Sequence, residues 1–84
     1  MPIISFTSDI GDKDYLPGAI KGKIASNLPN VQIIDITHLI GAGSISQAAA
    51  VIQEIYPYFP HGTVHVTVVD PGVGTERRLL ASDQ

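Results

Sequence analysis

The chain contains no cysteine among its 84 residues. Disulfide bonds, thiolate catalysis and zinc sites built on sulfur ligands are therefore excluded. Basic residues are also scarce: five lysines and arginines stand against eight acids, and they form no stripe along the sequence. A net charge of −3 and an isoelectric point of about 5.3 leave no electrostatic basis for binding nucleic acid.

Long apolar segments and targeting features are missing as well. No run approaches the roughly 20 apolar residues that a membrane span needs, so no membrane partner is predicted. The chain opens with Met1-Pro2-Ile3 and shows no basic region or cleavage site, so no signal peptide is predicted. We therefore expect a cytoplasmic protein.

The composition is rich in apolar residues and poor in charge. Apolar residues make up 44% of the chain, charged residues 15%, and mean hydropathy is +0.22. This is too apolar for a disordered segment, and it is little charge for a small domain with a large relative surface. Part of the surface is therefore expected to contact more protein.

The predicted elements alternate as strand, helix, strand, helix, strand. Strands are predicted at 3–7, 31–36 and 64–69, helices at 15–27 and from 45 to the prolines at 57 and 60, and a fourth strand begins at 79. This order predicts an α/β fold, the β-α-β-α-β portion of a mostly parallel sheet. Two helices cover both faces of such a sheet poorly, and the chain ends within a predicted strand. We expect residues 1–84 to be a partial N-terminal α/β domain whose C-terminal partner domain is absent from this chain.

The helices carry recognisable start signals. Asp14 is expected to cap the first helix, and Ser44 with Gln47 three residues later predicts a capping box for the second. Gly18 and Gly22 each lower helix propensity by roughly 1 kcal/mol, so we expect the first helix to pack closely against another element.

The run from Val68 to Arg78 is the most informative part of the chain. An apolar strand delivers Asp70 to a turn opened by proline and glycine, and Arg77 follows seven residues later. Ligands in α/β folds bind beyond the carboxyl ends of the strands, so Asp70 is the first candidate catalytic residue. An arginine partner keeps a carboxylate ionised, and such a pair can hold and polarise water. A structural salt bridge that fixes the loop is the alternative.

Asp9 follows the first strand at the same predicted edge. A carboxylate there commonly accepts hydrogen bonds from ribose hydroxyls, although Asp9 capping a turn is an equal alternative. The glycines at 72 and 74 do not follow the first strand and no lysine follows them, so a phosphate site is weakly supported.

The histidines show no metal-binding pattern. His38, His61 and His65 have irregular spacing, and core or surface histidines are several times commoner than ligands. Thr37 and His38 at the end of the second strand could instead form part of a pocket wall, so no metal ligand is assigned.

Five ordered motifs give the chain a family resemblance. They are Ser8-Asp9-Ile10-Gly11, Gly18-Ala19-Ile20-Lys21-Gly22, Asp35-Ile36-Thr37-His38, Phe59-Pro60-His61-Gly62-Thr63-Val64, and Val69-Asp70-Pro71-Gly72-Val73-Gly74 with Arg77-Arg78. In these motifs the chain resembles the S-adenosylmethionine hydroxide adenosyltransferases, the adenosine-forming hydrolases related to fluorinase and chlorinase. Ser8 and Ile10 replace a threonine and a phenylalanine of the family, and Leu16-Pro17 replaces Tyr-Val.

The resemblance implies an N-terminal α/β domain followed by a β-barrel, in a homotrimer that binds substrate between subunits. It implies that Asp9 binds the ribose hydroxyls. Asp70 and Arg77 would be two members of an Asp-Arg-His set that activates water, and the histidine has no counterpart in this chain. The isolated chain is therefore expected to be inactive.

The same resemblance separates hydrolase from halogenase. Halogenases have a tyrosine where this chain has Asp70, and the fluorinase has a threonine where it has Val73. A fixed carboxylate repels a halide ion. The sequence therefore predicts hydrolysis of S-adenosyl-L-methionine to adenosine and L-methionine, with no metal or other cofactor. A non-catalytic module that binds adenosine or assembles with other subunits is the alternative, and a generic nucleotide-binding fragment is a weaker one.

Overall fold

The computed structural model describes residues 2–69 and 78–83, which form one four-stranded sheet and two α-helices. The elements are β1 (Ile3–Ser8), α1 (Leu16–Asn27), β2 (Gln32–Thr37), α2 (Ile45–Ile55), the 3₁₀ turn η1 (Tyr56–Tyr58), β3 (Val64–Val69) and β4 (Arg78–Asp83). The predicted α/β fold is thus confirmed, with every described strand where the sequence placed it to within one residue.

The sheet has the strand order β2-β1-β3-β4, and its first three strands are parallel. β4 runs antiparallel to β3, with Val69 opposite Arg78. A parallel neighbour needs a crossover of a dozen or more residues, whereas only residues 70–77 separate these two strands. The short connection therefore dictates an antiparallel strand.

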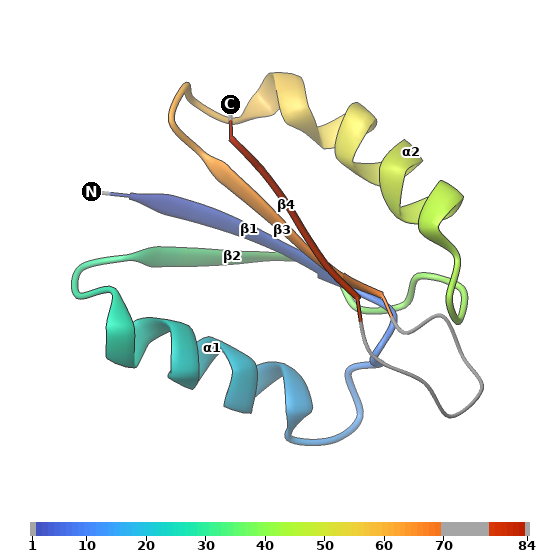
Figure 1. The fold of residues 1–84 in the computed structure, drawn as a ribbon, viewed down its shortest axis with the longest axis horizontal. Coiled ribbons are helices and arrows are strands. Elements are labelled where there is room, and N and C mark those ends of the chain that lie inside the picture. Colours follow the sequence, from blue (N-terminus) through green and yellow to red (C-terminus); the bar gives the residue numbers. More distant parts are fainter. Residues whose placement is uncertain (1, 70–77, 84) are drawn as a thin grey trace.

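The two crossover connections lead to opposite sides of β1. The connection through α1 leads to one side of β1, and the connection through α2 leads back past β1 to its other side. Right-handed crossovers that lead in opposite directions place their helices on opposite faces, as Figure 1 shows for α1 and α2. The reversal of strand order falls between β1 and β3, and ligands of open α/β sheets bind at the carboxyl end of such a point.

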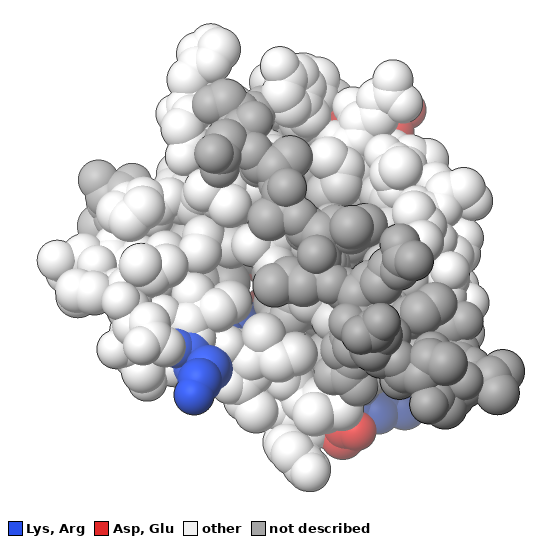
Figure 2. All heavy atoms as spheres, viewed as in Figure 1, with Lys and Arg blue, Asp and Glu red and all other residues white. Residues whose placement is uncertain are grey.

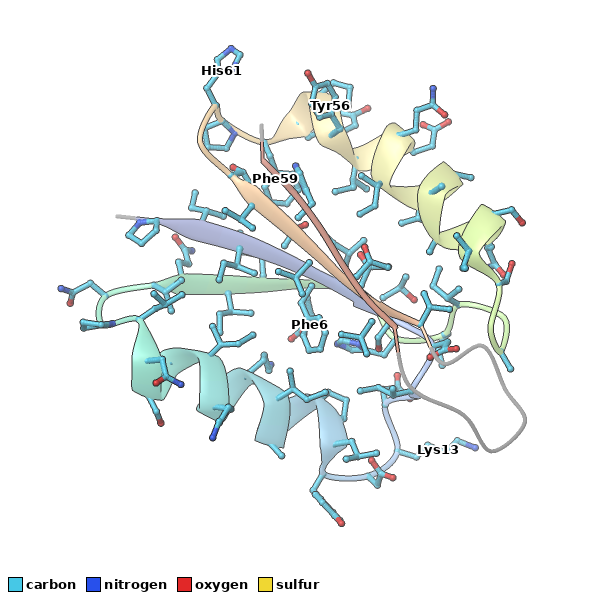
Figure 3. All side chains as sticks on the ribbon, in the orientation of Figure 1. Phe6, Lys13, Tyr56, Phe59 and His61 are labelled. Carbon is cyan, nitrogen blue, oxygen red and sulfur yellow. The ribbon has the colours of Figure 1, made fainter. Side chains whose placement is uncertain are left out.

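Each face of the sheet has its own packing. Phe6 is fully buried and lies between the sheet and α1 (Figure 3). On the other face, Val69 packs with Ile40 and with Ala48 of α2. β1 is central and buried from Ile4 onward, whereas β2 at the sheet edge has no fully buried residue. One helix on each face therefore covers the sheet incompletely, as the sequence predicted.

The face under α2 carries an unusual number of buried polar side chains. Ser5, Thr7, Thr63, His65 and Thr67 are all at most 4% exposed. Ser5 Oγ lies 2.6 Å from His65 Nδ1, and the Phe59 ring meets the His65 ring edge-to-face at 5.5 Å. A buried hydroxyl–imidazole hydrogen bond thus stands where an apolar contact is usual.

The expectation that α1 packs tightly at its glycines is wrong. A Cβ atom added at Gly18 or Gly22 would meet nothing within 4 Å. Both glycines lie on the exposed side of the helix, whereas Leu16, Ile20 and Ile24 on its other side are half-buried.

The predicted capping signals act in part. Asp14 Oδ1 accepts a hydrogen bond from the Leu16 backbone N–H at 2.9 Å. Ser44 Oγ accepts from the Gln47 backbone N–H at 3.2 Å, which is half of a capping box. The Gln47 side chain does not return to Ser44, because its oxygen accepts from the Gly41 backbone N–H at 2.8 Å. It thereby fastens the loop before α2 to the helix.

No helix in the described part of the chain is long and apolar enough to cross a membrane.

Candidate functional site

Asp9 lies directly beyond β1 at the reversal of strand order. Its backbone N–H donates to the Val68 carbonyl at 3.2 Å, which ties the end of β1 to β3. Its carboxylate Oδ2 accepts from the Gly43 backbone N–H at 2.8 Å. Gly43 has a positive φ of 69°, which a glycine adopts without strain. The Asp9 carboxylate therefore connects the ends of β1 and β3 to the loop that precedes α2.

The turn after β1 is fastened to the end of β2. The Gly11 backbone N–H donates to the His38 carbonyl at 2.7 Å, and the Ile40 backbone N–H donates to the Ser8 carbonyl at 3.2 Å. Gly11 has φ of 81°, so this turn uses the conformational freedom of glycine. These hydrogen bonds join the ends of β1 and β2 on both sides of Asp9 in the sequence.

His38 forms a buried contact with both of these strand ends. It is 7% exposed, and its Nδ1 lies 2.6 Å from Ser8 Oγ. Its Nε2 lies 2.8 Å from Asp35 Oδ1, and its ring meets Phe6 edge-to-face at 4.7 Å. His65 is likewise buried, at 2% exposure. His61 is exposed in the turn before β3 (Figure 3).

Asp35 extends this contact to α1. Its Oδ2 accepts from Lys21 Nζ at 2.6 Å, and the two side chains are 39% and 34% exposed. Partial burial raises the pKa of Asp35, but the hydrogen bonds from Lys21 and His38 and the positive charge of Lys21 lower it more. The net effect is a pKa below the ordinary value of 3.8, so Asp35 is a carboxylate at neutral pH.

No metal centre is formed within residues 2–69 and 78–83. No three histidine, aspartate or glutamate side chains of these residues gather as ligands. On the face shown in Figure 2, the lysine atoms of the described residues are scattered and form no basic patch.

Among the described residues, two surface hollows lie away from the carboxyl edge of the sheet. One, of about 580 Å³, is lined by Ala50, Gln53, Glu54, Pro57 and Tyr58 on the outer side of α2. The other, of about 300 Å³, lies at the amino ends of β1 and β3 and is lined by Pro2, Ile3, Pro60, His61, Gly62 and Thr63. Neither includes Asp9.

Of the three candidate site residues, the structure describes Asp9. Asp70 and Arg77 lie outside the described residues. The neighbours of that segment are informative, because Val69 and Arg78 are directly opposite each other in β3 and β4. Val69 and Arg78 therefore lie at the same edge of the sheet as Asp9.

Sequence reasoning missed the side-chain contacts behind Asp9. It identified Asp35 and His38 as a cluster at the end of a strand, but gave neither a partner. Ser8 is 30 residues from His38, and Lys21 is 14 residues from Asp35. The register of β1 against β2 brings Ser8 to His38, and the position of α1 beside the sheet brings Lys21 to Asp35.

Comparison with known sequences decides the family. Residues 4–84 match the family described as the SAM hydroxide adenosyltransferase N-terminal domain. The chain belongs to this family. The resemblance of its five motifs is thereby confirmed.

Individual relatives agree with this assignment. A Salinispora arenicola protein named (R)-S-adenosyl-L-methionine hydrolase is 48% identical over 80 residues, which cover 95% of this chain and 30% of that protein. A Nocardia brasiliensis protein named Fluorinase is 38% identical over 80 residues, covering 95% of this chain and 27% of the relative. A crystal structure of a conserved hypothetical protein from Thermus thermophilus matches with a TM-score of 0.77 and 37% identity, covering 93% of this chain and 33% of that one. This chain of the hydroxide adenosyltransferase family thus spans about 30% of the length of the curated relatives it matches.

Proposed function

We propose that the protein to which this chain belongs hydrolyses S-adenosyl-L-methionine to adenosine and L-methionine. The observation that carries the proposal is the 48% identity, over 95% of the chain, to a protein named (R)-S-adenosyl-L-methionine hydrolase. The position of Asp9 at the reversal of strand order supports it, because this is where α/β sheets bind nucleoside ligands.

The proposed reaction is attack of water or hydroxide on the 5′ carbon of the substrate. The carbon–sulfur bond breaks, the sulfonium leaves as the neutral thioether of methionine, and the attacking oxygen becomes the 5′ hydroxyl of adenosine. When the nucleophile is water, it also loses one proton, which passes to solvent. Because the leaving group is neutral, it needs no general acid. The site must orient the nucleophile in line with the breaking bond, and positioning of this kind contributes roughly 7–11 kcal/mol in favourable systems.

Three residues carry the proposed roles. Asp9 anchors the ribose hydroxyls through its carboxylate, one oxygen of which is already oriented by the Gly43 N–H. Asp70 holds the attacking water, and Arg77 orients Asp70 and stabilises developing hydroxide. These roles are supported by Val69 and Arg78, which adjoin Asp70 and Arg77 in the sequence and lie opposite each other at the edge of the sheet where Asp9 lies.

Water is proposed as the nucleophile rather than a halide ion. A fixed carboxylate at position 70 repels a halide but accepts a hydrogen bond from water and favours its deprotonation. The identities point the same way, at 48% to the relative named as a hydrolase and 38% to the one named Fluorinase.

The names of the relatives also suggest a stereochemical preference. Four of them, at 37–48% identity, are named for the (R) configuration of S-adenosyl-L-methionine. We propose that this protein likewise takes the (R) epimer at the sulfonium. The two epimers differ in the arrangement of the methyl group, the methionine chain and the lone pair around sulfur, so a site shaped for one arrangement discriminates against the other.

The remaining parts of the proposal concern the setting of the reaction. We propose a cytoplasmic homotrimer in which the substrate lies between this domain and the C-terminal domain of a neighbour. The low charge content of the chain supports contact with further protein. We also propose that the reaction uses no metal or redox cofactor, since displacement of a neutral thioether requires neither.

The test is a product assay on the longest form of the protein that can be expressed, supplied with each sulfonium epimer separately. We expect adenosine and methionine from the (R) epimer, and no adenosine after Asp70→Ala. Glu54→Gln, which changes an exposed residue of α2, is the matched control and should retain wild-type turnover. Wild-type turnover by Asp70→Ala would remove Asp70 from the mechanism, and preference for the (S) epimer would refute the stereochemical part.

A further inference from the structure

Four side chains next to Asp9 are joined by successive hydrogen bonds. They are Lys21 of α1, Asp35 of β2, His38 directly after β2, and Ser8 at the end of β1. The successive contacts measure 2.6, 2.8 and 2.6 Å from Lys21 to Ser8. The row runs from the surface to a serine with 0% exposure, and it ends on the residue that precedes Asp9.

We propose that this hydrogen-bonded row of four side chains, the positioning chain, fixes the place of the Asp9 carboxylate, with the Nε2–H of His38 donated to Asp35. The link from this inference to catalysis rests on the proposed function, because Asp9 is the proposed ribose anchor. The geometric part, that the chain fixes Asp9, stands on the structure alone.

For an uncharged His38 ring, the hydrogen bonds allow one consistent assignment of protons. Ser8 Oγ accepts from the Ile10 backbone N–H at 3.3 Å and has one proton to donate, which goes to His38 Nδ1. Nδ1 is then an acceptor, so the ring proton lies on Nε2 and is donated to Asp35 Oδ1 at 2.8 Å. The other tautomer would face a lone pair on Nε2 toward a carboxylate oxygen, which is repulsive.

The positioning chain acts on Asp9 through the backbone on both sides of it. Ser8 Oγ holds the Ile10 N–H, and the Ser8 carbonyl accepts from the Ile40 N–H at 3.2 Å. The His38 carbonyl holds the Gly11 N–H at 2.7 Å. Residues before and after Asp9 are thus fixed to the end of β2. The backbone of Asp9 is thereby fixed, so its Oδ2 is held in place to accept the hydrogen bond from the Gly43 N–H.

The molecule contains its own control for this inference. Ser5 Oγ lies 2.6 Å from His65 Nδ1, the same pair of atoms at the same distance as in Ser8 and His38. Both serines are 0% exposed on the same strand. Their positions are three residues apart, so the two serines point to opposite faces of the sheet. Removing either hydroxyl deletes a buried serine–histidine hydrogen bond, but only Ser8 is next to Asp9.

The experiment compares Ser8→Ala with Ser5→Ala by hydrogen exchange of the Gly43 amide, measured by NMR. We expect exchange at Gly43 to become about tenfold faster in Ser8→Ala and to change less than about twofold in Ser5→Ala, relative to the global exchange of each variant. Ser8→Thr keeps the hydroxyl and should restore slow exchange. Equal changes in both alanine variants, or none in Ser8→Ala, would overturn the proposal.

Two further measurements sharpen the test. The ring nitrogen shifts of His38 should report a proton on Nε2, and a proton on Nδ1 would overturn the assignment. Lys21→Met changes only the exposed end of the positioning chain and leaves buried Ser8 in place. It should accelerate Gly43 exchange in the same direction and by less, and an unchanged rate would count against the chain acting as a unit.

Ligand binding connects the positioning chain to catalysis. In the longest expressible form, Ser8→Ala should weaken adenosine binding by about tenfold. The affinity for 2′,3′-dideoxyadenosine, which lacks the 2′ and 3′ hydroxyls of the ribose, should stay unchanged. An equal loss for both nucleosides would show a structural effect and overturn the link to Asp9. If the wild-type protein bound no adenosine, the proposed function would fail, whereas Gly43 exchange would still decide the positioning chain.

Discussion

Replacing Asp9 by asparagine separates its proposed binding role from its structural one. The carboxylate accepts from the Gly43 N–H at 2.8 Å, and an asparagine carbonyl oxygen can keep that bond. A hydrogen bond to a neutral group contributes about 1 kcal/mol, so the free energy of unfolding should change by less than about 1 kcal/mol. The negative charge offered to the ribose hydroxyls is lost entirely.

The expected loss of affinity follows from the same comparison. Hydrogen bonds to charged groups contribute about 1.5–3 kcal/mol, so Asp9→Asn should weaken adenosine binding by roughly tenfold to a hundredfold. Asp9→Ala should lose affinity to a similar extent. It should also lower the free energy of unfolding by about 1–3 kcal/mol, because the Gly43 N–H loses its acceptor.

Calorimetric titration with adenosine and urea unfolding measure the two quantities independently. Glu54→Gln, which removes an exposed charge on α2, is the control for net charge. Asp9→Asn with wild-type affinity would refute the ribose role. Equal loss of stability in the asparagine and alanine variants would refute the structural separation.

Three further predictions concern the fold. Phe6→Ala should lower the free energy of unfolding in urea by about 3–5 kcal/mol, because Phe6 is fully buried, and a loss under about 1 kcal/mol would contradict that packing. Gly18→Ala should raise it by about 0.5–1 kcal/mol, because the added methyl meets open space on a helix, and destabilisation would contradict the exposed placement. The pKa of Asp35 is lowered in the fold, so its carboxylate stabilises the protein above its ordinary value of 3.8, and that contribution is lost as pH falls from there through the lowered value. Acid unfolding of Asp35→Asn should lack this component, and identical pH profiles would contradict the contact with Lys21 and His38.

The order of elements could be predicted because it rests on local patterns. Alternation of strand and helix signals predicted three parallel strands, and Ser44 with its glutamine predicted the start of α2. The predicted first strand placed Asp9 at its carboxyl end, and Asp9 became a candidate because ligands bind beyond the carboxyl ends of parallel strands. No pattern specified the direction of β4, which depends on the length of the connection before it.

The contacts behind Asp9 could not be predicted from local sequence. Ser8 and His38 are 30 residues apart, and Asp9 and Gly43 are 34 apart, so their meeting depends on strand register and loop path. Glycines in a helix pattern are equally compatible with close packing and with an open surface. At Gly18 the added Cβ meets open space, and only the tertiary structure distinguishes the two cases.

The measurement that tests the central claim most directly is a mass-spectrometric product assay in oxygen-18 water. It uses the longest expressible form of the protein and the (R) epimer of S-adenosyl-L-methionine. The account predicts adenosine with one oxygen-18 atom at the 5′ position, together with unlabelled methionine. A protein that binds the substrate and releases no labelled adenosine would contradict it.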